Sequence, residues 1–229
     1  MKSFLVLCPL AIELESILAR LRERKLSYRE EQVGTLKVFH VLELSLILGL
    51  AGHGKTQFGI QTQFLLNQFS NIGAVFCAGC AGGLDESVSL FDVVVAEKTI
   101  EHDFRLRFIS RPIPEFSGDA ALLQKFSRLS FDGFRIHIGR IASGDEDIVD
   151  PARAKEIKDQ TQARVVAWEG AGGARACKFN SVPFIEIRGV TDFANHSSTT
   201  DFKANLKIAM AHVCDAILLA IPKQSLQTT

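Results

Sequence analysis

The sequence has no excess of charge of either sign and no long apolar run. Its 229 residues include 26 Lys and Arg against 26 Asp and Glu, so the formal net charge is zero. No cluster of basic residues provides the positive surface that binds nucleic acids or anionic membranes. No apolar run approaches the ~20 residues that a membrane-spanning helix requires. We therefore expect a small-molecule partner, and neither nucleic acid nor membrane.

The amino-terminal segment lacks the features of a secretion signal. One positive charge precedes a short apolar run, Pro9 interrupts that run, and acids follow at Glu13 and Glu15. A signal peptide has a longer apolar stretch and a cleavage site of small residues. We interpret this segment as a first strand and expect a cytoplasmic protein.

Cysteine is scarce, and its odd number argues against a disulfide framework. The five cysteines lie mostly in apolar runs and are expected to be small buried thiols: Cys8, Cys77, Cys80, Cys177 and Cys214. Cys77 and Cys80 form a C-x-x-C pair, but a redox pair of this kind opens a helix, whereas this one continues into glycines. Redox chemistry is therefore disfavoured.

Motifs for cofactors are also missing. The GHGK segment lacks the earlier glycine of a phosphate-binding P-loop, and no dinucleotide fingerprint is present. His53 and His102 have no second ligand at metal-binding spacing, so we expect them to order loops. The sequence thus predicts neither a metal ion nor an organic cofactor.

Short apolar runs alternate with helical patterns along the chain. The runs predict strands over residues 4–8, 36–42, 44–50, 74–77, 92–96, 134–142, 165–168 and 183–190. Apolar residues at helical spacing predict helices near residues 14–21, 58–66 and 153–162, and a last helix from the N-cap Thr200 to Ile221.

This alternation is typical of an α/β fold. We expect three α-β-α layers, with helices on both faces of a central mixed, largely parallel twisted sheet. No repeat or linker divides the chain, so we expect a single domain over residues 1–222 and a loose tail at 223–229.

Two lone acids stand where apolar runs give way to loops. Glu169 follows VVAW and precedes the Gly-rich GAGG, and Asp192 closes FIEIRGVT. Other apolar runs give way to glycine or acid at residues 8–15, 49–55 and 79–84. Strand ends converge at one edge of an α/β sheet, where glycines let a ligand approach the backbone. We therefore predict a small-molecule site at this edge.

Together these segments resemble the nucleoside phosphorylase and nucleosidase superfamily, most closely its methylthioadenosine/S-adenosylhomocysteine nucleosidase branch. CAGCAGGL with FDVVVAEKTIEHD resembles the Gly-rich turn, the strand and the His-Asp pair of that family. AWEGAGGARAC resembles its Glu-Met-Glu-Ala segment, and IRGVTDFAN its Arg-x-(Ile/Val)-Ser-Asp segment. With CPLAIELESIL, which resembles the amino-terminal strand and helix start, the similarity extends from Phe4 to about Phe202. It implies a nucleoside phosphorylase-like fold and hydrolysis of the N-glycosidic bond of a 5′-modified adenosine.

The resemblance also implies catalytic roles. Asp192 would donate a proton towards purine N7, for which its carboxyl group must be protonated. Glu13 would orient or deprotonate the attacking water, and Arg188 and Cys80 would help to hold that water. Glu169 would accept hydrogen bonds from the ribose 2′- and 3′-hydroxyls.

Further residues are implied to contact the substrate. Main-chain groups near Ile148 would meet the base edge, and Phe202 would line the 5′ pocket. Gly82, in the AGCAGGL turn, would allow close approach of the substrate. Trp168 lies below the sugar and His53 near the 5′ pocket in this comparison.

The sequence departs from the family pattern at several of these positions. Asp147 stands where a Phe usually packs on the purine, and Trp168 replaces a Met. Cys80 replaces a Ser or Thr, Ala167 replaces an acid, and His53 replaces an apolar residue. These changes leave the base and the 5′ substituent open.

Several alternatives also stay open. The related futalosine hydrolases and purine nucleoside phosphorylases share the general pattern, although CPLAIELE is acidic where a phosphorylase carries a basic phosphate loop. A non-catalytic nucleoside-binding or storage protein is possible, because Asp192 alone could cap a turn and Glu13 alone could be a helix-start acid. Family members are commonly homodimers, and residues 109–116 could contact the neighbouring subunit.

Overall fold

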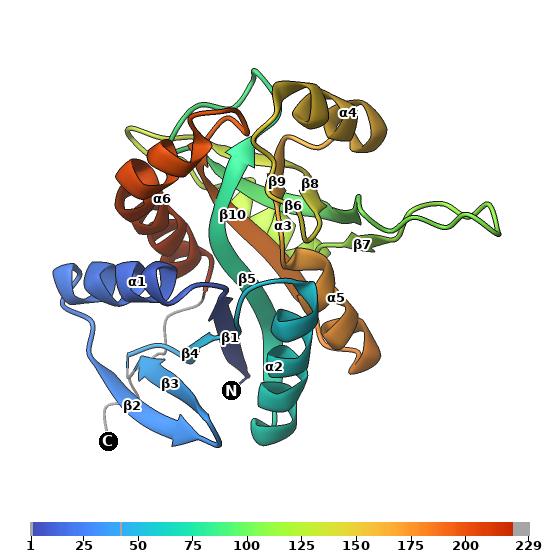
Figure 1. Ribbon diagram of the computed structural model, residues 1–229. Helices are drawn as coiled ribbons and strands as arrows, with labels where there is room; N and C mark the ends of the chain where they lie inside the picture. The colour runs from blue at the N-terminus through green and yellow to red at the C-terminus, as the bar shows by residue number, and fades with distance from the viewer. Residues whose placement is uncertain (1, 42, 222–229) are drawn as a thin grey trace, which may run out of the picture.

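A computed structural model describes residues 2–41 and 43–221 (Figure 1). The strands are β1 (Ser3–Cys8), β2 (Tyr28–Val33), β3 (Leu36–Val41), β4 (Leu46–Leu50), β5 (Ile72–Gly83), β6 (Val93–Glu101), β7 (Glu115–Ser117), β8 (Ile136–Ser143), β9 (Val165–Ala167) and β10 (Phe184–Asp192). The helices are α1 (Ala11–Glu23), α2 (Lys55–Gln68), α3 (Ala120–Phe126), α4 (Pro151–Thr161), α5 (Gly170–Phe179) and α6 (Ser198–Ala220). The tail predicted at 223–229 lies outside the described residues.

All ten strands belong to one mixed sheet in the order β10-β6-β8-β9-β5-β1-β4-β3-β2, with β7 added beside β6. Strand β10 also pairs with β5, so β5, β9, β8, β6 and β10 close into a ring. The predicted α/β fold with a mixed sheet is confirmed.

The sheet is less parallel than we predicted, and part of it is closed. Five of the strand pairings are parallel and five are antiparallel. The physical reason is β5, which pairs with β1 over residues 72–77, with β10 over residues 75–82 and with β9 at residues 82–83. Glycines allow a strand to bend in this way. The sheet is therefore partly a closed ring and not only the middle of three layers.

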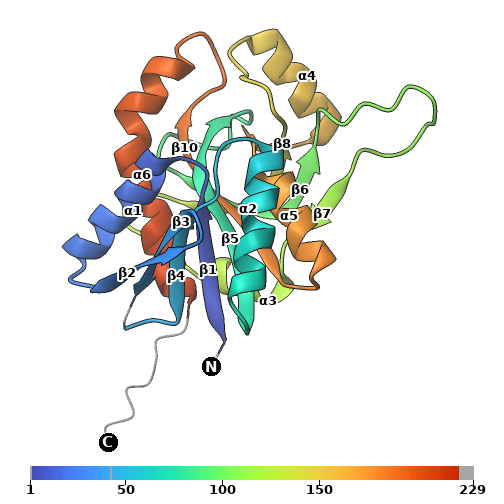
Figure 2. The ribbon, with the colours of Figure 1, turned by 60° about the horizontal axis from the view of Figure 1, so that its bottom comes forward.

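Helices pack on the open part of the sheet and on the outside of the ring (Figure 2). One core cluster buries Ile17 of α1 and Met210 of α6 against β1 and β5, and a second buries Phe58 of α2 and Cys177 of α5 against the other face. A third cluster, which includes Val94, fills the ring. None of the helices in residues 2–41 and 43–221 has the length and apolar character needed to cross a membrane.

Helix α3 was not predicted from the sequence, and two further helices differ from the prediction. Helix α5 occupies Gly170–Phe179, where we expected a glycine-rich loop. A Cβ on Gly172 would lie 2.0 Å from the carbonyl oxygen of Lys55, so this glycine allows α5 and α2 to pack closely. Helix α6 begins at Ser198 and not after Thr200, and its N-cap residue makes no side-chain capping bond. The start of α5 therefore depends on a contact with α2.

The segment between β6 and β7, residues 102–114, extends from the body of the protein as a long arm (Figure 1). Its tip is apolar and basic, because Phe108 and Ile109 are exposed between Arg107 and Arg111. An exposed apolar tip of this kind indicates a contact surface.

Candidate active site

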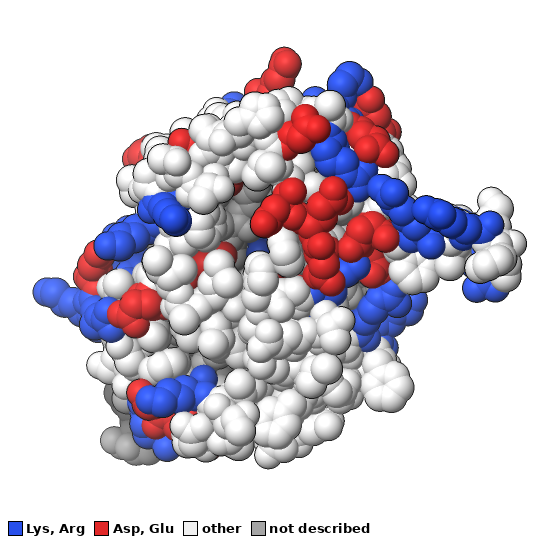
Figure 3. Space-filling model, viewed as in Figure 1, with Lys and Arg blue, Asp and Glu red and all other residues white. Residues whose placement is uncertain are grey.

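A cavity of about 340 Å³ lies at the carboxyl ends of β5 and β10. It is lined by all ten residues that we predicted for the site: Glu13, His53, Cys80, Gly82, Ile148, Trp168, Glu169, Arg188, Asp192 and Phe202. The face in Figure 3 is hollowed beside a group of acidic side chains. Seven different elements and loops bring these residues together, although they are spread over most of the chain.

Parallel pairing explains why the residues converge. Strands β1 and β10 both run parallel to β5, so their carboxyl ends lie at one edge. The first turn of α1 follows β1 and places Glu13 there, while Cys80 and Gly82 lie near the end of β5 and Asp192 ends β10. Ligand sites form at such edges because loops and helix starts surround them.

Glu13 is fixed at the cavity wall by two main-chain groups. Its Oε1 accepts a hydrogen bond from the Cys80 N–H at 2.7 Å, and its Oε2 accepts one from the Leu10 N–H at 2.9 Å. Burial, together with the nearby charge of Glu169, raises the pKa of Glu13 to about 7 against the opposing effect of Arg188. A carboxyl group with this pKa can take up and release a proton near neutral pH.

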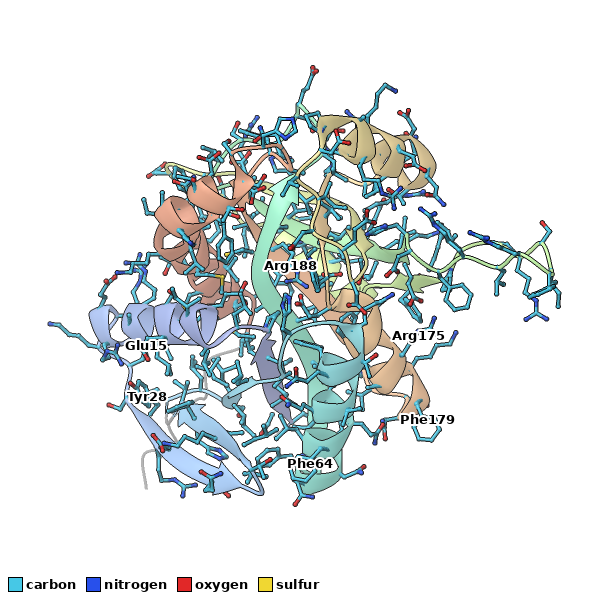
Figure 4. All side chains as sticks on the ribbon, in the orientation of Figure 1. Glu15, Tyr28, Phe64, Arg175, Phe179 and Arg188 are labelled. Carbon is cyan, nitrogen blue, oxygen red and sulfur yellow. The ribbon has the colours of Figure 1, made fainter. Side chains whose placement is uncertain are left out.

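Arg188 lies in the interior of the protein between β5 and β10 (Figure 4) and is 1% exposed. Its Nη2 donates to Glu169 Oε2 at 3.1 Å and to Cys77 Sγ at 3.3 Å. Its Nη1 donates to the Cys80 carbonyl at 3.4 Å, and its Nε to Glu186 Oε1 at 2.9 Å. The guanidinium group therefore acts mainly on protein groups that surround the cavity.

Glu169 is held on both of its oxygens. Oε1 accepts from the Gly54 N–H at 3.3 Å and lies 3.2 Å from His53 Nδ1, while Oε2 accepts from Arg188. Burial raises the pKa of Glu169, but the hydrogen bond from His53 and the charge of Arg188 outweigh this and keep the pKa below its usual range. Glu169 is thus an ionised acceptor at the cavity wall.

His53 and Trp168 form one side of the cavity. Their rings lie against each other, with centroids 4.2 Å apart and planes tilted by 31°. The hydrogen bond to Glu169 raises the pKa of His53 although partial burial opposes this. The imidazole therefore contacts the apolar ring of Trp168 on one side and the carboxylate of Glu169 on the other.

Asp192 presents a carboxyl group at the end of β10 and is 7% exposed. Its Oδ1 accepts from the Ala194 N–H at 3.0 Å, and its Oδ2 accepts from the Thr191 hydroxyl at 2.9 Å. A Cβ on Gly82 would lie 2.9 Å from Asp192 Oδ1, so the glycine keeps space for this carboxyl group. The contacts orient Asp192 without an ion pair to Lys or Arg in the described structure.

The match to a family model decides the family. The Phosphorylase superfamily model covers residues 3–222, which is almost the whole chain. The chain belongs to the Phosphorylase superfamily. The resemblance that we identified from the sequence motifs is thereby confirmed.

Relatives within the superfamily carry a consistent description. A 5′-methylthioadenosine/S-adenosylhomocysteine nucleosidase of Thermotoga maritima is 33% identical over 171 residues, which cover 75% of this chain and 76% of the relative. The nucleosidase of the same description from Tolumonas auensis is 27% identical over 222 residues, covering 88% and 96% of the two chains.

Solved structures of superfamily members share the fold. A Helicobacter pylori methylthioadenosine/S-adenosylhomocysteine nucleosidase mutant with 5′-methylthioadenosine in its active site has a TM-score of 0.87 at 19% identity, covering 96% of this chain and 98% of that one. The Neisseria meningitidis nucleosidase in complex with methylthio-immucillin-A gives 0.84 at 24% identity, with the same coverage. Futalosine hydrolase of Helicobacter pylori gives 0.83 at 20% identity, covering 96% and 97%.

Some cavity residues of this superfamily member were not predicted from the sequence. Thr191 also lines the cavity, and its hydroxyl binds Asp192. Glu146 lines it too, but Arg153 neutralises it through two hydrogen bonds of 2.9 and 2.8 Å. Thr191 directly precedes Asp192 and could have been found from that position, whereas the pairing of Glu146 depends on the fold.

Within residues 2–41 and 43–221, no group of three His, Cys, Asp or Glu side chains could hold a metal ion.

All five cysteines are buried and free, as expected for small apolar thiols. Burial raises the pKa of the Cys80 thiol well above its usual value, with the charge of Glu13 as a second cause. A thiol in this environment stays protonated and is a poor nucleophile. In the cavity, Cys80 thus contributes mainly its main-chain groups, which bind Glu13 and Arg188.

Proposed function

We propose that this protein is a purine nucleosidase that hydrolyses the N-glycosidic bond of a 5′-modified adenosine, such as methylthioadenosine or S-adenosylhomocysteine. One observation carries the proposal: Glu13, Glu169 and Asp192, three buried carboxyl groups with different partners, line a single cavity. The relatives named above support the same reaction, since they are described as nucleosidases for these two nucleosides.

The proposed chemistry gives each acid a distinct task. Cleavage passes through a ribosyl cation, so the base must leave with an added proton and water must attack the sugar. Asp192 donates its proton to purine N7 as the bond from C1′ to N9 breaks and its electron pair moves to the base. Glu13 accepts a proton from the water whose oxygen bonds to C1′. Glu169 accepts hydrogen bonds from the 2′- and 3′-hydroxyls.

The charges of the cavity favour water over phosphate as the nucleophile. Among the described residues that line it, Arg188 is the one Lys or Arg, and its guanidinium group already binds Glu169, Glu186 and Cys80. A phosphate dianion would also face the carboxylate of Glu13. Two negative charges in a buried cavity repel each other more strongly than they do in water. Hydrolysis is therefore preferred over phosphorolysis.

His53 favours a second candidate substrate. It lies half-exposed at the cavity where the family pattern has an apolar residue, and its raised pKa increases its positive charge near neutral pH. A polar imidazole beside the 5′ position would suit a 5′ substituent that is larger and more polar than a methylthio group. Futalosine hydrolase activity is thus the alternative within the same reaction class.

A homodimer and a cytoplasmic location belong to the same proposal. The arm at residues 102–114 exposes Phe108 and Ile109, and Figure 3 shows basic side chains along it. In each subunit Asp147 lines the cavity, and Asp145 lines a second hollow that adjoins it at His53. The basic arm of a second copy would meet these acids as opposite charges. Light scattering after size-exclusion chromatography should give a dimer mass, and a monomer mass would contradict this part.

The function is tested by a phosphate-free assay against methylthioadenosine, S-adenosylhomocysteine, futalosine, adenosine and inosine. Free base and free sugar are followed by chromatography, with and without added phosphate. We expect base release without phosphate for the 5′-modified substrates. Strict dependence on phosphate would reject hydrolysis, and binding without release in either condition would support a non-catalytic nucleoside-binding protein.

A further inference from the structure

Glu186 is a fully buried acid that the proposed chemistry does not use. It lies on β10, has 0% exposure and does not line the cavity. An isolated carboxylate is costly in such a place, so its partners must account for its presence. Burial raises the pKa of Glu186 above its usual value, and the charge of Arg188 and the hydrogen bond from Thr99 offset only part of this effect.

The partners of Glu186 come from three elements. The Thr99 hydroxyl on β6 donates to Oε2 at 2.6 Å, and Arg188 Nε on β10 donates to Oε1 at 2.9 Å. A Cβ on Gly170, the first residue of α5, would lie 2.0 Å from Oε2, so the carboxylate touches the helix start. Positive partial charge at a helix N-terminus stabilises a carboxylate. The environment thus supports an ionised Glu186 that is bound to Arg188.

Arg188 transmits this contact to the cavity. With Nε bound to Glu186, the guanidinium plane directs Nη2 to Glu169 Oε2 and Nη1 to the Cys80 carbonyl. The same Cys80 residue donates its N–H to Glu13. A guanidinium group is rigid and planar, so an anchor at one nitrogen sets the direction of the other two.

We propose that Glu186 is a positioning residue of the active site, which anchors Arg188 so that Glu169 can accept hydrogen bonds from the ribose. Its charge is as important as its position. Among the described residues, Arg188 is the one buried Lys or Arg, and the charges of Glu13, Glu169 and Glu186 all act on it. Without a charged Glu186, Arg188 pairs more tightly with Glu169 and leaves Oε2 less available to the 2′-hydroxyl. This inference rests on the proposed function, because it concerns the group that would hold the sugar.

The test compares a ribonucleoside with its 2′-deoxy counterpart. The wild type and Glu186→Gln are assayed with the nucleoside that the wild type cleaves best and with the 2′-deoxy form of that nucleoside. The measured ratio is kcat/KM for the ribonucleoside divided by kcat/KM for its 2′-deoxy form. We expect this ratio to fall by roughly tenfold in Glu186→Gln, since a charge-assisted hydrogen bond to the 2′-hydroxyl is weakened. Thr99→Val, which removes one hydrogen bond of Glu186, should lower the ratio in the same direction but less.

Asp215→Asn is the matched control. Asp215 is also a buried acid bound to arginines, but it joins α1 and α6 away from the cavity. Its variant should leave the ratio unchanged. Thermal melts identify the variants that fold; if Glu186→Gln does not fold, the ratio for Thr99→Val decides.

The outcomes separate the two proposals. An unchanged ratio in folded Glu186→Gln, even with a lower overall rate, would show that Glu186 is only structural. A ratio that falls equally in Asp215→Asn would contradict the inference as well. A wild type that cleaves neither nucleoside would overturn the proposed function, and with it this inference.

Discussion

The main-chain N–H of Cys80 donates to Glu13 Oε1 at 2.7 Å, and this contact joins the end of β5 to the first turn of α1. A Cβ on Gly79 would lie 2.8 Å from the same oxygen and 2.6 Å from Arg188 Nη1. The missing side chain at Gly79 therefore lets the acid and the guanidinium group approach the strand together. The site depends on this close packing as much as on the charged groups.

The first prediction concerns pH. Burial and the charge of Glu169 raise the pKa of Glu13 to about 7, and only the deprotonated form can accept a proton from water. The kcat/KM value should therefore be low at acid pH and rise with increasing pH, with the midpoint of the rise at about pH 7. Glu13→Gln should lower kcat by at least about a hundredfold and remove this rise. A wild-type profile that is flat between about pH 5 and pH 8 would contradict this role.

The second prediction concerns the proton donor. Asp192→Asn keeps the shape of the side chain but cannot give a proton to the base, so kcat should fall by about 10² to 10⁴. Its fold should be unchanged, because an amide oxygen can still accept from the Ala194 N–H. Circular dichroism and calorimetric titration with an uncleaved nucleoside analogue provide the control. Rates close to those of the wild type would mean that another group protonates the base.

The third prediction concerns stability and a pair of helices. Arg20 of α1 and Arg24, the residue that follows this helix, each form two hydrogen bonds with Asp215 of α6, at 2.6 to 3.1 Å. Asp215→Asn should lower the free energy of unfolding by about 1–3 kcal/mol at pH 7, since charged hydrogen bonds are lost. Glu15→Gln, at an exposed pair with Arg22, should cost less than Asp215→Asn, because solvent screens exposed ion pairs. Equal losses in urea melts would contradict this ranking.

The effect of Asp215 should also depend on pH. Burial raises the pKa of Asp215, but the hydrogen bonds from Arg20 and Arg24 outweigh it and hold the pKa below its usual range. The ion pairs therefore contribute fully above the unfolded-state pKa of about 3.9, and the contribution is lost as pH falls through the lower folded value. The difference between wild type and Asp215→Asn should shrink below about pH 4. A stability difference between the two proteins that grows as the pH falls below about 4 would contradict this role of the ion pairs.

The fourth prediction concerns the contact between α2 and α5. Gly172→Ala would place a Cβ 2.0 Å from the main-chain oxygen of Lys55, which cannot move without separating the helices. We expect a loss of about 2 kcal/mol or more in the free energy of unfolding. Gly59→Ala meets Gly172 at 3.1 Å and gains about 1 kcal/mol in helix propensity, so its net change should be small. Thermal melts in which Gly59→Ala is the more damaging variant would refute this.

Much of the site could be predicted from the sequence, for a physical reason. Glu13 and Asp192 stand where apolar runs end, and β1 and β10 run parallel to β5, so these ends lie at one edge. Glu169 follows β9, which runs antiparallel to β5, so its place at the same cavity depends on the closed ring and not on that rule. Their chemical roles stay predictions until they are measured.

Other features depend on contacts that are distant in sequence. The GAGG stretch has a poor helix propensity, and α5 forms because Gly170 and Gly172 fit against Glu186 and Lys55. The second pairing of β10, which closes the ring, has no signal in the local pattern of β10. The alternation in FIEIR places Glu186 and Arg188 on the same face of β10, but their burial required the structure.

The most direct test of the hydrolytic mechanism is to run the reaction in water labelled with heavy oxygen and with phosphate present. The released sugar is analysed by mass spectrometry, with Asp192→Asn as the inactive control. The proposed chemistry predicts free sugar that carries one labelled oxygen at C1′, and no sugar phosphate. A sugar 1-phosphate would instead show that phosphate is the nucleophile and would contradict the role given to Glu13.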